Sequence, residues 1–429
     1  MPQKKIKLMF DATIFFNAIN KGSNRSGIFF TAYQVAKRLA KHPDVDLLFY
    51  CSPNKIKKLL ESINEELPEF KNVPFYYEKH NYVQQKRDFY KYVKKEAKER
   101  VFFILAFLFH YARFFYSIIS YIFNMNIEKN TSEFSVNAYL SPMSCFPQKF
   151  LFGDIKKYII LHDVIPLKFP KYFPDVKKGD HWLLRVINQL KNYHNCYGFT
   201  NSKNTKDDFL QYIPDLKSEK IIVTPLAAGD SFNPCSKEDT IKSLKKYGLP
   251  TNKKYVFSLC SLEPRKNLIR AVKTFVQFIE KNQINDLVFI LGGGHWKEFI
   301  GKLDAELGKI PEGLVIKAGY IDDEDLAPLY SGAEWFVYTS QYEGFGLPPL
   351  EAMQCGCPVI TSNNSSLPEV VGDAGIMIDW DSDEQHIKAY EDYYFNPELR
   401  EQMRQRGLER AKQFSWDKTV DLMIKEMMK

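Results

Sequence analysis

Short apolar runs recur along the chain, and each is followed by a polar loop and a segment with apolar residues at helical spacing. The first run, residues 6–10, ends at Asp11, and residues 28–39 then carry apolar side chains three and four positions apart. Residues 44–50 form the next run. Alternating strands and helices build βαβ units, whose strands pair in parallel. The first half therefore predicts a parallel sheet, with further strands at 158–161, 198–200 and 221–225.

The same alternation restarts after residues 225–234, a passage with proline and glycine that breaks any regular element. We place the domain boundary there, with one domain at 1–228 and a second at 229–414. Buried strands joined by short or helical connections are typical of a doubly wound sheet. The predicted fold class is α/β, with two Rossmann-like domains facing each other across a cleft. In the second domain, strands are predicted at 255–259, 287–291, 314–317 and 335–338, and helices at 267–280 and 325–330.

One segment breaks this alternation, at about 82–125, and we interpret it as a helical, aromatic insertion in the first domain. A run with many lysines at 86–100 precedes an apolar run at 101–123 that is long enough to span a bilayer. His110 and Arg113 interrupt its centre, and a charge at mid-bilayer is costly. We therefore favour a helix that lies in the membrane surface, its lysines on anionic lipid. A helical hairpin buried in a homo-oligomer interface or an enlarged core is the alternative.

Composition excludes several classes of protein. With 45% hydrophobic and 26% charged residues, the 429-residue chain is typical of soluble globular proteins. A net charge of +7 over this length does not indicate a nucleic-acid binder. Seven scattered cysteines without C-x-x-C spacing predict no zinc or redox site and fit a reducing cytosol. The first residues lack the pattern of a secretory signal, so we expect no export.

The most informative motif runs from residue 342 to residue 353, directly after a predicted strand. Glycines at 344 and 346 let the backbone approach a ligand and expose N–H groups. The helix that follows offers free N–H donors and partial positive charge, which suit a phosphate. Glu351 in that helix can accept hydrogen bonds from a ribose diol, while Glu343 in the loop contacts another part of the same ligand. The alternative is that Glu351 only favours the helix dipole and Glu343 is a solvated charge.

A second motif, SLEPRKN at 261–267, follows the strand at 255–259 and so lies at the same edge of the sheet. Arg265 and Lys266 stand at a helix start, where the dipole prefers anions. An anionic ligand explains them better than surface solubility does. Fixed cations stabilise a diphosphate leaving group as its charge develops.

These residues carry a resemblance to a known family. The SLEPRKN motif, the block at 319–362 and residues 366–375 resemble glycosyltransferase family 4, retaining enzymes of the two-domain GT-B fold. The match is dense from 255 to 416 and looser in the first half, where it is clearest at 161–173 and 199–209. The resemblance implies an acceptor-side first domain and a nucleotide-sugar-binding second domain. It also implies that the C-terminal helix, at about 415–429, packs back on the first domain.

The resemblance assigns roles to the motif residues. Glu351 would hold the ribose, Glu343 the donor sugar or its nearby phosphate, and Arg265 with Lys266 the diphosphate. Backbone groups of the loop Gly344, Phe345, Gly346 and Leu347 would contact phosphate and sugar. His162 resembles the histidine that faces the donor sugar, although a turn histidine bonded beside Asp163 is the alternative. Gly27 matches the glycine of the first loop, and a plain loop glycine is nearly as good a reading.

We therefore expect a retaining hexosyltransferase that uses a nucleotide-diphosphate sugar and a glycan or lipid-linked glycan acceptor. The first half is most like enzymes of bacterial O-antigen or capsule synthesis, which favours GDP-mannose over a UDP-sugar. We expect no metal and no cofactor, since residues 292–294 are not G-x-G-x-x-G and no Asp-x-Asp ends a strand. The expected location is cytoplasmic, peripheral to the inner face of the membrane. A non-catalytic glycan- or nucleotide-binding protein, or a UDP-sugar epimerase of the same fold, remains the alternative.

Overall fold

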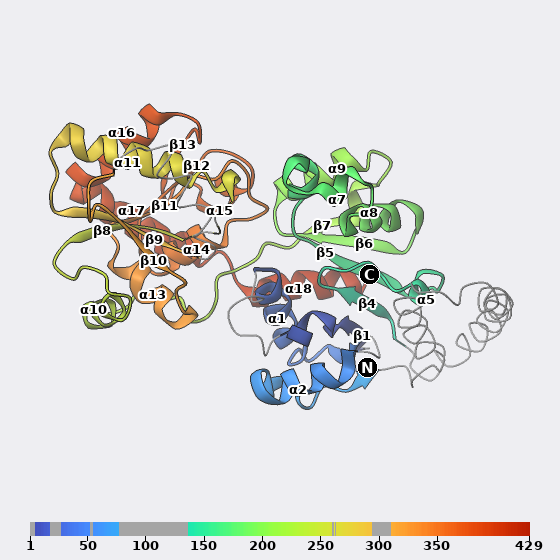
Figure 1. Ribbon diagram of the computed structural model, residues 1–429. Coiled ribbons are helices and arrows are strands. Elements are labelled where there is room, and N and C mark those ends of the chain that lie inside the picture. The colour runs from blue at the N-terminus through green and yellow to red at the C-terminus, as the bar shows by residue number, and fades with distance from the viewer. Residues whose placement is uncertain are drawn as a thin grey trace, which may run out of the picture. The chain divides into compact units, whose positions relative to one another are not determined.

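The computed structural model describes residues 5–17, 27–51, 55–76, 136–259, 261, 263–293 and 310–429. Two sheets form its framework, one of seven strands and one of six, each accompanied by helices (Figure 1). The chain divides into two compact units, Met1–Pro142 with Pro147–Tyr158 and Met428, and Met143–Phe146 with Ile159–Met427 and Lys429. The two parallel sheets confirm the predicted fold class.

The seven-stranded sheet has the order β3-β2-β1-β4-β5-β6-β7. Strands β1 to β3 are added toward one edge of the sheet, and β4 to β7 are added toward the other edge, starting beside β1. Its strands are short and buried, because parallel strands covered by helices on both faces expose few side chains. Within the first unit, Phe10, Phe15, Phe49 and Phe70 pack ring against ring. The strands are β1 (Ile6–Asp11), β2 (Val45–Tyr50), β3 (Phe75–Tyr76), β4 (Ala138–Ser141), β5 (Lys156–Leu161), β6 (Cys196–Thr200) and β7 (Ile221–Val223).

The six-stranded sheet has the order β10-β9-β8-β11-β12-β13, and all its pairs are parallel. The order reverses between β8 and β11, which makes the edge beyond these two strands the place where such sheets bind ligands. The strands are β8 (Lys254–Leu259), β9 (Leu287–Gly292), β10 (Val315–Gly319), β11 (Trp335–Tyr338), β12 (Val359–Ser362) and β13 (Ile376–Ile378).

Helices connect most of the strands. The following bounds apply: η1 (Ala12–Asn17), α1 (Gly27–Leu39), α2 (Ile56–Glu66), η3 (Pro68–Phe70), α5 (Gln148–Leu151), α6 (Ile165–Lys168), η5 (Pro170–Tyr172), α7 (Pro174–Lys177), α8 (Trp182–Asn192), α9 (Lys203–Tyr212), η6 (Ser218–Lys220), α10 (Lys237–Lys246), η7 (Pro264–Lys266), α11 (Leu268–Asn282), α13 (Asp323–Gly332), α14 (Leu347–Gln354), α15 (Leu367–Val371), α16 (Asp383–Phe395), α17 (Pro397–Ala411) and α18 (Trp416–Met427).

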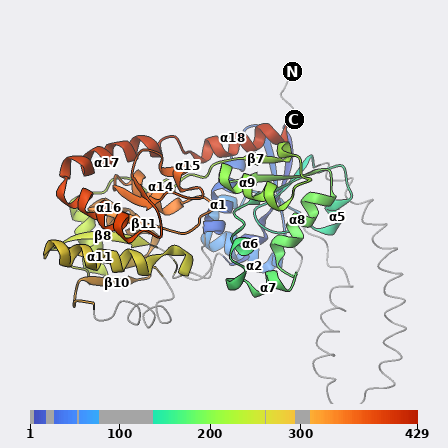
Figure 2. The same ribbon diagram turned by 90° about the horizontal axis from the view of Figure 1, so that it is seen from above.

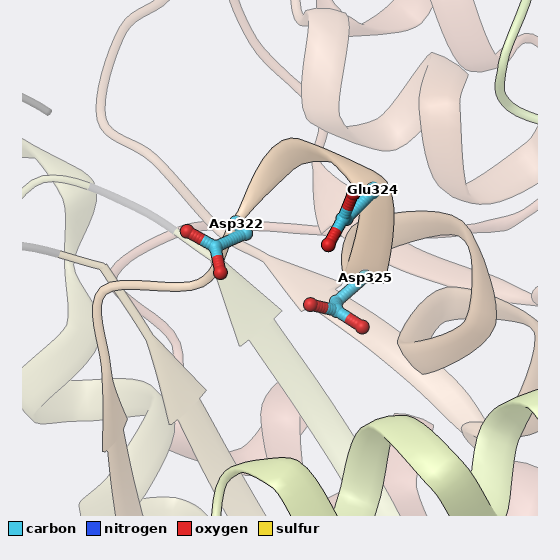
Figure 3. A group of neighbouring side chains, drawn as sticks. All are labelled: Asp322, Glu324 and Asp325. Atoms are coloured by element: carbon cyan, nitrogen blue, oxygen red, sulfur yellow. The ribbon is translucent and has the colours of Figure 1, made fainter. Parts of the chain in front are cut away.

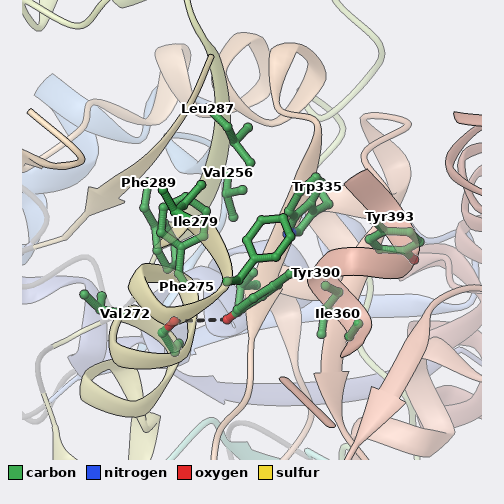
Figure 4. Packing of buried hydrophobic residues seen from close by; sticks show 14 of the residues in the cluster. Val256, Val272, Phe275, Ile279, Leu287, Phe289, Trp335, Ile360, Tyr390 and Tyr393 are labelled. Atoms are coloured by element: carbon green, nitrogen blue, oxygen red, sulfur yellow. Dashed lines mark hydrogen bonds between the residues drawn. The ribbon is translucent and has the colours of Figure 1, made fainter. Parts of the chain in front are cut away.

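Side chains of the six-stranded sheet alternate between two apolar layers, as the period of a strand requires. Trp335 packs with Tyr390 of α16 (Figure 4), in the layer that α11 also covers (Figure 2). The adjacent residue Phe336 points to the opposite face, where it meets Tyr330 of α13. Tyr390 is fully buried, and its hydroxyl donates to the backbone oxygen of Ala271, 3.1 Å away, so the polar atom of this side chain is paired. The two layers fix β8 and β11 and thereby the edge beyond them.

Some elements differ from the sequence-based expectation. Strands β3, β4, β12 and β13 were not predicted, and β5 begins two residues earlier than expected. None of the helices formed by the described residues is both long and apolar enough to cross a membrane. The predicted insertion at about 82–125, which includes the proposed membrane-binding segment at 86–124, lies outside the described residues.

Candidate functional site

The loops after β8 and β11 meet at the switch point of the six-stranded sheet. β8 leads into η7, and β11 leads into a loop that ends at α14. The backbone N–H of Gln341 donates to the backbone oxygen of Arg265 at 2.7 Å, which joins the two loops directly. The two motifs that the sequence placed at one edge therefore lie side by side.

Arg265, Lys266 and Glu343 form a buried ionic cluster at this edge. Glu343 Oε1 lies 2.6 Å from Lys266 Nζ and 3.2 Å from Arg265 Nη1. Each of the three side chains is only 9% exposed. Arg265 also donates to Glu263 Oε2 and to the backbone oxygen of Tyr342, both at 2.9 Å. The three residues that the resemblance assigns to the diphosphate and the donor sugar, Arg265, Lys266 and Glu343, are thus in direct contact.

The charges in this cluster stabilise one another. Burial disfavours ionised Glu343, but the positive charges of Lys266 and Arg265 outweigh burial and hold the pKa of Glu343 below its ordinary value. Burial also disfavours the positive charge of Arg265, but the negative charges of Glu343 and Glu263 outweigh burial and raise the pKa of Arg265 above its ordinary value. Two of the three buried charges are positive, and the side chain of Glu263 is 44% exposed and so screened by solvent. Within these three side chains the positive charges exceed the negative charge by one, and the buried carboxyl of Asp163 lies within electrostatic reach of all three.

Hydroxyl groups hold the carbonyl groups of the glycine loop. Ser366 Oγ lies 3.0 Å from the backbone oxygen of Glu343 and 2.7 Å from that of Phe345, and its one proton serves either acceptor. Ser365 Oγ accepts the backbone N–H of Glu343 at 3.0 Å. The backbone oxygen of Gly344 also accepts hydroxyl donors, which come from α9.

The N–H groups of the same loop are left for a ligand. In a trans peptide the N–H points opposite to the carbonyl of the preceding residue. The carbonyl groups of Glu343, Gly344 and Phe345 point toward hydroxyl groups. The N–H group of the residue after each of them therefore points in the opposite direction. Gly344, Phe345, Gly346 and Leu347 have no hydrogen-bond partner for their backbone N–H among the described residues. Four adjacent donors at the start of α14, beside buried cations, form an arrangement that binds anions.

Glu351 lies apart from the ionic cluster. It belongs to α14, is half-buried, and accepts a hydrogen bond from the Tyr330 hydroxyl at 3.2 Å. Burial raises the pKa of Glu351 to about 7, and the negative charge of Asp323 adds to this. Among the described residues no ion pair joins Glu351 to a cation. The structure therefore gives the two glutamates different environments, one paired with cations and one with a tyrosine hydroxyl.

His162 directly follows β5 and is buried, with 8% of its surface exposed. Its backbone oxygen accepts from Asn201 Nδ2 at 2.7 Å and would lie 2.3 Å from a Cβ atom on Gly344. Both residues belong to the second compact unit. The structure therefore places the His162 backbone against the glycine loop.

Asp163 is a site residue that the sequence did not single out. Its Oδ1 accepts the backbone N–H of Ile165 at 2.8 Å. Burial raises the pKa of Asp163 to about 6, and its charge interacts with Arg265, Glu343 and Lys266. The only sequence signal was its position after His162 at the end of a buried strand.

Gly27 begins α1 in the first compact unit, and its backbone oxygen accepts from Thr31 Oγ1 at 2.8 Å. Its carbonyl thus takes part in the first turn of the helix. The predicted role of Gly27 beside the donor stays a prediction.

Asp322, Glu324 and Asp325 bring three carboxylates together around the first turn of α13 (Figure 3). Lys246 of α10 forms ion pairs with all three carboxylates. Its Nζ lies 2.9 Å from Asp322, 3.4 Å from Glu324 and 2.5 Å from Asp325. Burial opposes ionisation of Asp325, but hydrogen bonds from Lys246 and from Ser243 lower its pKa. An ammonium group therefore already stands where a cation would bind.

Comparison with known proteins places the chain among glycosyltransferases. Residues 239–410 match the family model described as "Glycosyl transferases group 1". The chain is 34% identical over 261 residues to an O-antigen chain mannosyltransferase B of Escherichia coli, covering 60% of this chain and 66% of the relative. It is 31% identical over 281 residues to the serotype-specific mannosyltransferase WbdA of the same species, covering 63% of this chain and 33% of WbdA.

Solved structures share the fold over nearly the whole chain. HepE of Anabaena, crystallised with UDP and glucose, aligns with a TM-score of 0.63 at 15% identity and 98% coverage of both chains. WaaG, a glycosyltransferase involved in lipopolysaccharide biosynthesis, aligns with a TM-score of 0.60 at 12% identity and 98% coverage of both chains. The matched part of this chain spans about two thirds of the first mannosyltransferase and one third of WbdA. The chain therefore contains a glycosyl transferases group 1 domain on a GT-B framework and is related to the O-antigen mannosyltransferases.

Proposed function

We propose that the protein is a retaining glycosyltransferase that moves a hexose from a nucleotide-diphosphate sugar to a glycan or lipid-linked glycan in bacterial surface polysaccharide synthesis. The observation that carries the proposal is the buried Arg265, Lys266 and Glu343 cluster beside four unpartnered N–H groups at the start of α14. The named mannosyltransferase relatives favour GDP-mannose, with a UDP-sugar as the alternative donor.

Each group has a role that follows from its chemistry. Arg265 and Lys266 bind the diphosphate, and the loop N–H groups bind phosphate and sugar oxygens. Glu343 is held ionised by the two cations, so it accepts hydrogen bonds from a sugar hydroxyl over the neutral pH range. Glu351 holds the ribose diol, and His162 faces the sugar.

The proposed reaction is a displacement on one face of the sugar. The bond between the anomeric carbon and the diphosphate oxygen breaks, and the acceptor oxygen bonds to the same face of that carbon. The acceptor proton passes to the leaving diphosphate, so configuration is retained without an enzymatic nucleophile. Positive charge builds on the sugar ring and negative charge on the diphosphate, and Arg265 with Lys266 stabilises the latter. No metal or cofactor takes part in this scheme.

We also propose that residues 86–124 attach the protein to the inner face of the membrane. The support is the sequence alone, a lysine-rich run followed by an aromatic run. Extraction of membranes with carbonate tests this. Release supports surface attachment, retention supports spanning, and a fully soluble dimer supports a protein interface instead.

Acceptor-dependent release of nucleoside diphosphate tests the function. The full chain is mixed with GDP-mannose or UDP-glucose, with and without a lipid-linked mannose disaccharide, and free nucleoside diphosphate is measured. Release that requires the disaccharide supports transfer. Donor binding without release indicates a binding protein, and a changed sugar without acceptor indicates an epimerase. Either of these outcomes contradicts the proposal.

A further inference from the structure

The backbone oxygen of Gly344 is the meeting point of two hydroxyl groups from a distant part of the chain. Ser202 Oγ lies 2.8 Å and Thr205 Oγ1 lies 3.0 Å from this oxygen. All three residues are buried, with Thr205 fully so. A carbonyl oxygen has two lone pairs and each hydroxyl has one proton, so both hydroxyl groups can donate at once.

This pair of donors sets the direction of one N–H group. The Gly344 carbonyl and the Phe345 N–H belong to one planar trans peptide and point in opposite directions. Because the carbonyl is held toward α9, the Phe345 N–H is held away from it. That N–H is one of the four that have no partner among the described residues.

Further contacts keep α9 in register with the loop. The Glu369 carboxylate accepts the backbone N–H groups of Lys203 and Asn204, both at 2.7 Å, at the start of α9. The Tyr342 hydroxyl, two residues before Gly344, donates to Asp208 Oδ2 at 2.6 Å on the same helix. These residues and Ser202 lie in one compact unit. The helix is therefore fixed between the two hydroxyl residues, at Lys203 and Asn204, and one turn after them, at Asp208.

We propose that Ser202 and Thr205 are positioning residues of the donor site, whose hydroxyl groups aim the Phe345 N–H at the phosphate or sugar of the bound nucleotide-sugar. The inference rests on the proposed function. Ser202 also accepts the backbone N–H of Thr205 at 3.0 Å as the N-cap of α9, so its hydroxyl has a second, structural task. The Thr205 hydroxyl lies 3.0 Å from Ser202 Oγ but makes no capping hydrogen bond to the backbone of α9, which makes Thr205 the cleaner position to test.

The test compares hydroxyl removal with hydroxyl retention. Thr205→Val keeps the volume and removes the donor, whereas Thr205→Ser keeps the donor. Ser202→Ala combined with Thr205→Val removes both donors. Affinity for GDP and for UDP is measured by calorimetry on the full chain, together with the melting temperature. Ser236→Ala, which removes the N-cap of α10, controls for loss of a helix cap.

We expect the double variant to bind the preferred nucleoside diphosphate about tenfold more weakly, the size of one well-placed hydrogen bond to a charged group. Thr205→Val should fall between it and the native chain, Thr205→Ser should restore native affinity, and Ser236→Ala should not change affinity. If the double variant does not fold, the comparison of Thr205→Val with Thr205→Ser decides. Equal affinity in all variants would overturn the inference alone. A native chain that binds neither GDP nor UDP would overturn the proposed function as well.

Discussion

At the residue scale, a short turn brings the side chains of two adjacent cations, Arg265 and Lys266, to one carboxylate. Both reach Glu343, although consecutive side chains in an extended strand would point apart. The 3-10 turn η7 brings them to the same side. Neither is a solvated surface charge, because each side chain is 9% exposed. Their buried position gives an electrostatic role a stronger basis than their sequence did.

Replacing either cation by alanine should lower transfer strongly. We expect Arg265→Ala or Lys266→Ala to reduce kcat/KM by about 10² to 10³, as loss of one charge-stabilising donor does in other enzymes. Steady-state kinetics on the two variants measure this. Lys273→Ala is the matched control, since Lys273 pairs with Asp383 and its side chain is 48% exposed. Unchanged turnover in both cation variants would remove them from the proposed mechanism.

Glu351 should make the protein less stable as pH rises. Its pKa is about 7 in the folded chain against an ordinary 4.5, so the folded state holds the proton more tightly than the unfolded state does. The contribution of this proton to the free energy of unfolding is complete below pH 4.5 and is lost as the pH rises toward 7. Glu351→Gln keeps an acceptor for Tyr330 without the charge. It should match the native chain at acid pH and exceed it by about 2 to 4 kcal/mol at pH 8.

Urea unfolding at several pH values measures the difference between the two chains. A difference that does not change between acid pH and pH 8 would contradict the environment described for Glu351. Asp163, whose pKa is also raised, remains in both chains and does not affect the comparison.

The sequence predicted the parts of the site that are local. Glu343, the glycines and Glu351 lie within one motif, and the physical properties of a loop and a helix start suggest their chemistry. Ser202 and Gly344 are 142 residues apart, and no local pattern records that they touch. Ser202 lies within residues 199–209, which carry part of the family resemblance, and it is the N-cap of α9. Its second contact follows from the packing of α9 on the loop, which sequence spacing does not contain.

At the element scale, some short strands were predicted from the sequence and others of the same length were not. Residues 335–338 were predicted with the bounds of β11. β12 and β13 have four and three residues, no fewer than β11 and β7, so their length alone does not explain why they were not predicted. β4 also has only four residues, and all of them are buried. Such strands form because neighbouring strands offer pairing, which is a tertiary effect.

The contact between β5 and the glycine loop should not tolerate a side chain at Gly344. A Cβ atom there would lie 2.3 Å from the backbone oxygen of His162, and a backbone atom cannot move aside as a flexible side chain can. We expect Gly344→Ala to lose about 1 to 3 kcal/mol of unfolding free energy. It should also abolish measurable transfer, because the loop N–H groups shift with the backbone.

Chemical denaturation and the transfer assay check this. Gly153→Ala is the control, since a Cβ atom there meets nothing within 4 Å. A Gly344→Ala chain with native stability and activity would show that the loop and the end of β5 do not pack as described.

At the scale of the whole molecule, the C-terminal helix is tied to the passage where the domain boundary was predicted. Trp416 of α18 donates from Nε1 to the backbone oxygen of Ala228 at 3.1 Å, across 188 residues of chain. The Thr419 hydroxyl hydrogen-bonds to the backbone oxygen of Pro225. The predicted boundary at 228 and the packing of the last helix on the first domain stay predictions. The contacts themselves join α18 to its own compact unit.

Trp416 should therefore stabilise that unit in two separable ways, by its buried ring and by its N–H group. Trp416 is 1% exposed, so Trp416→Ala leaves a large cavity and should cost about 3 to 5 kcal/mol. Trp416→Phe keeps much of the ring but leaves the Ala228 oxygen without its donor, which should cost about 1 to 3 kcal/mol. Leu422→Ala, at a position of α18 that is 42% exposed, should change stability by less than about 0.5 kcal/mol. Urea unfolding curves on the four chains test the order. If Trp416→Phe were as stable as the native chain, the hydrogen bond across 188 residues would contribute nothing, and packing alone would hold α18 to residues 225–228.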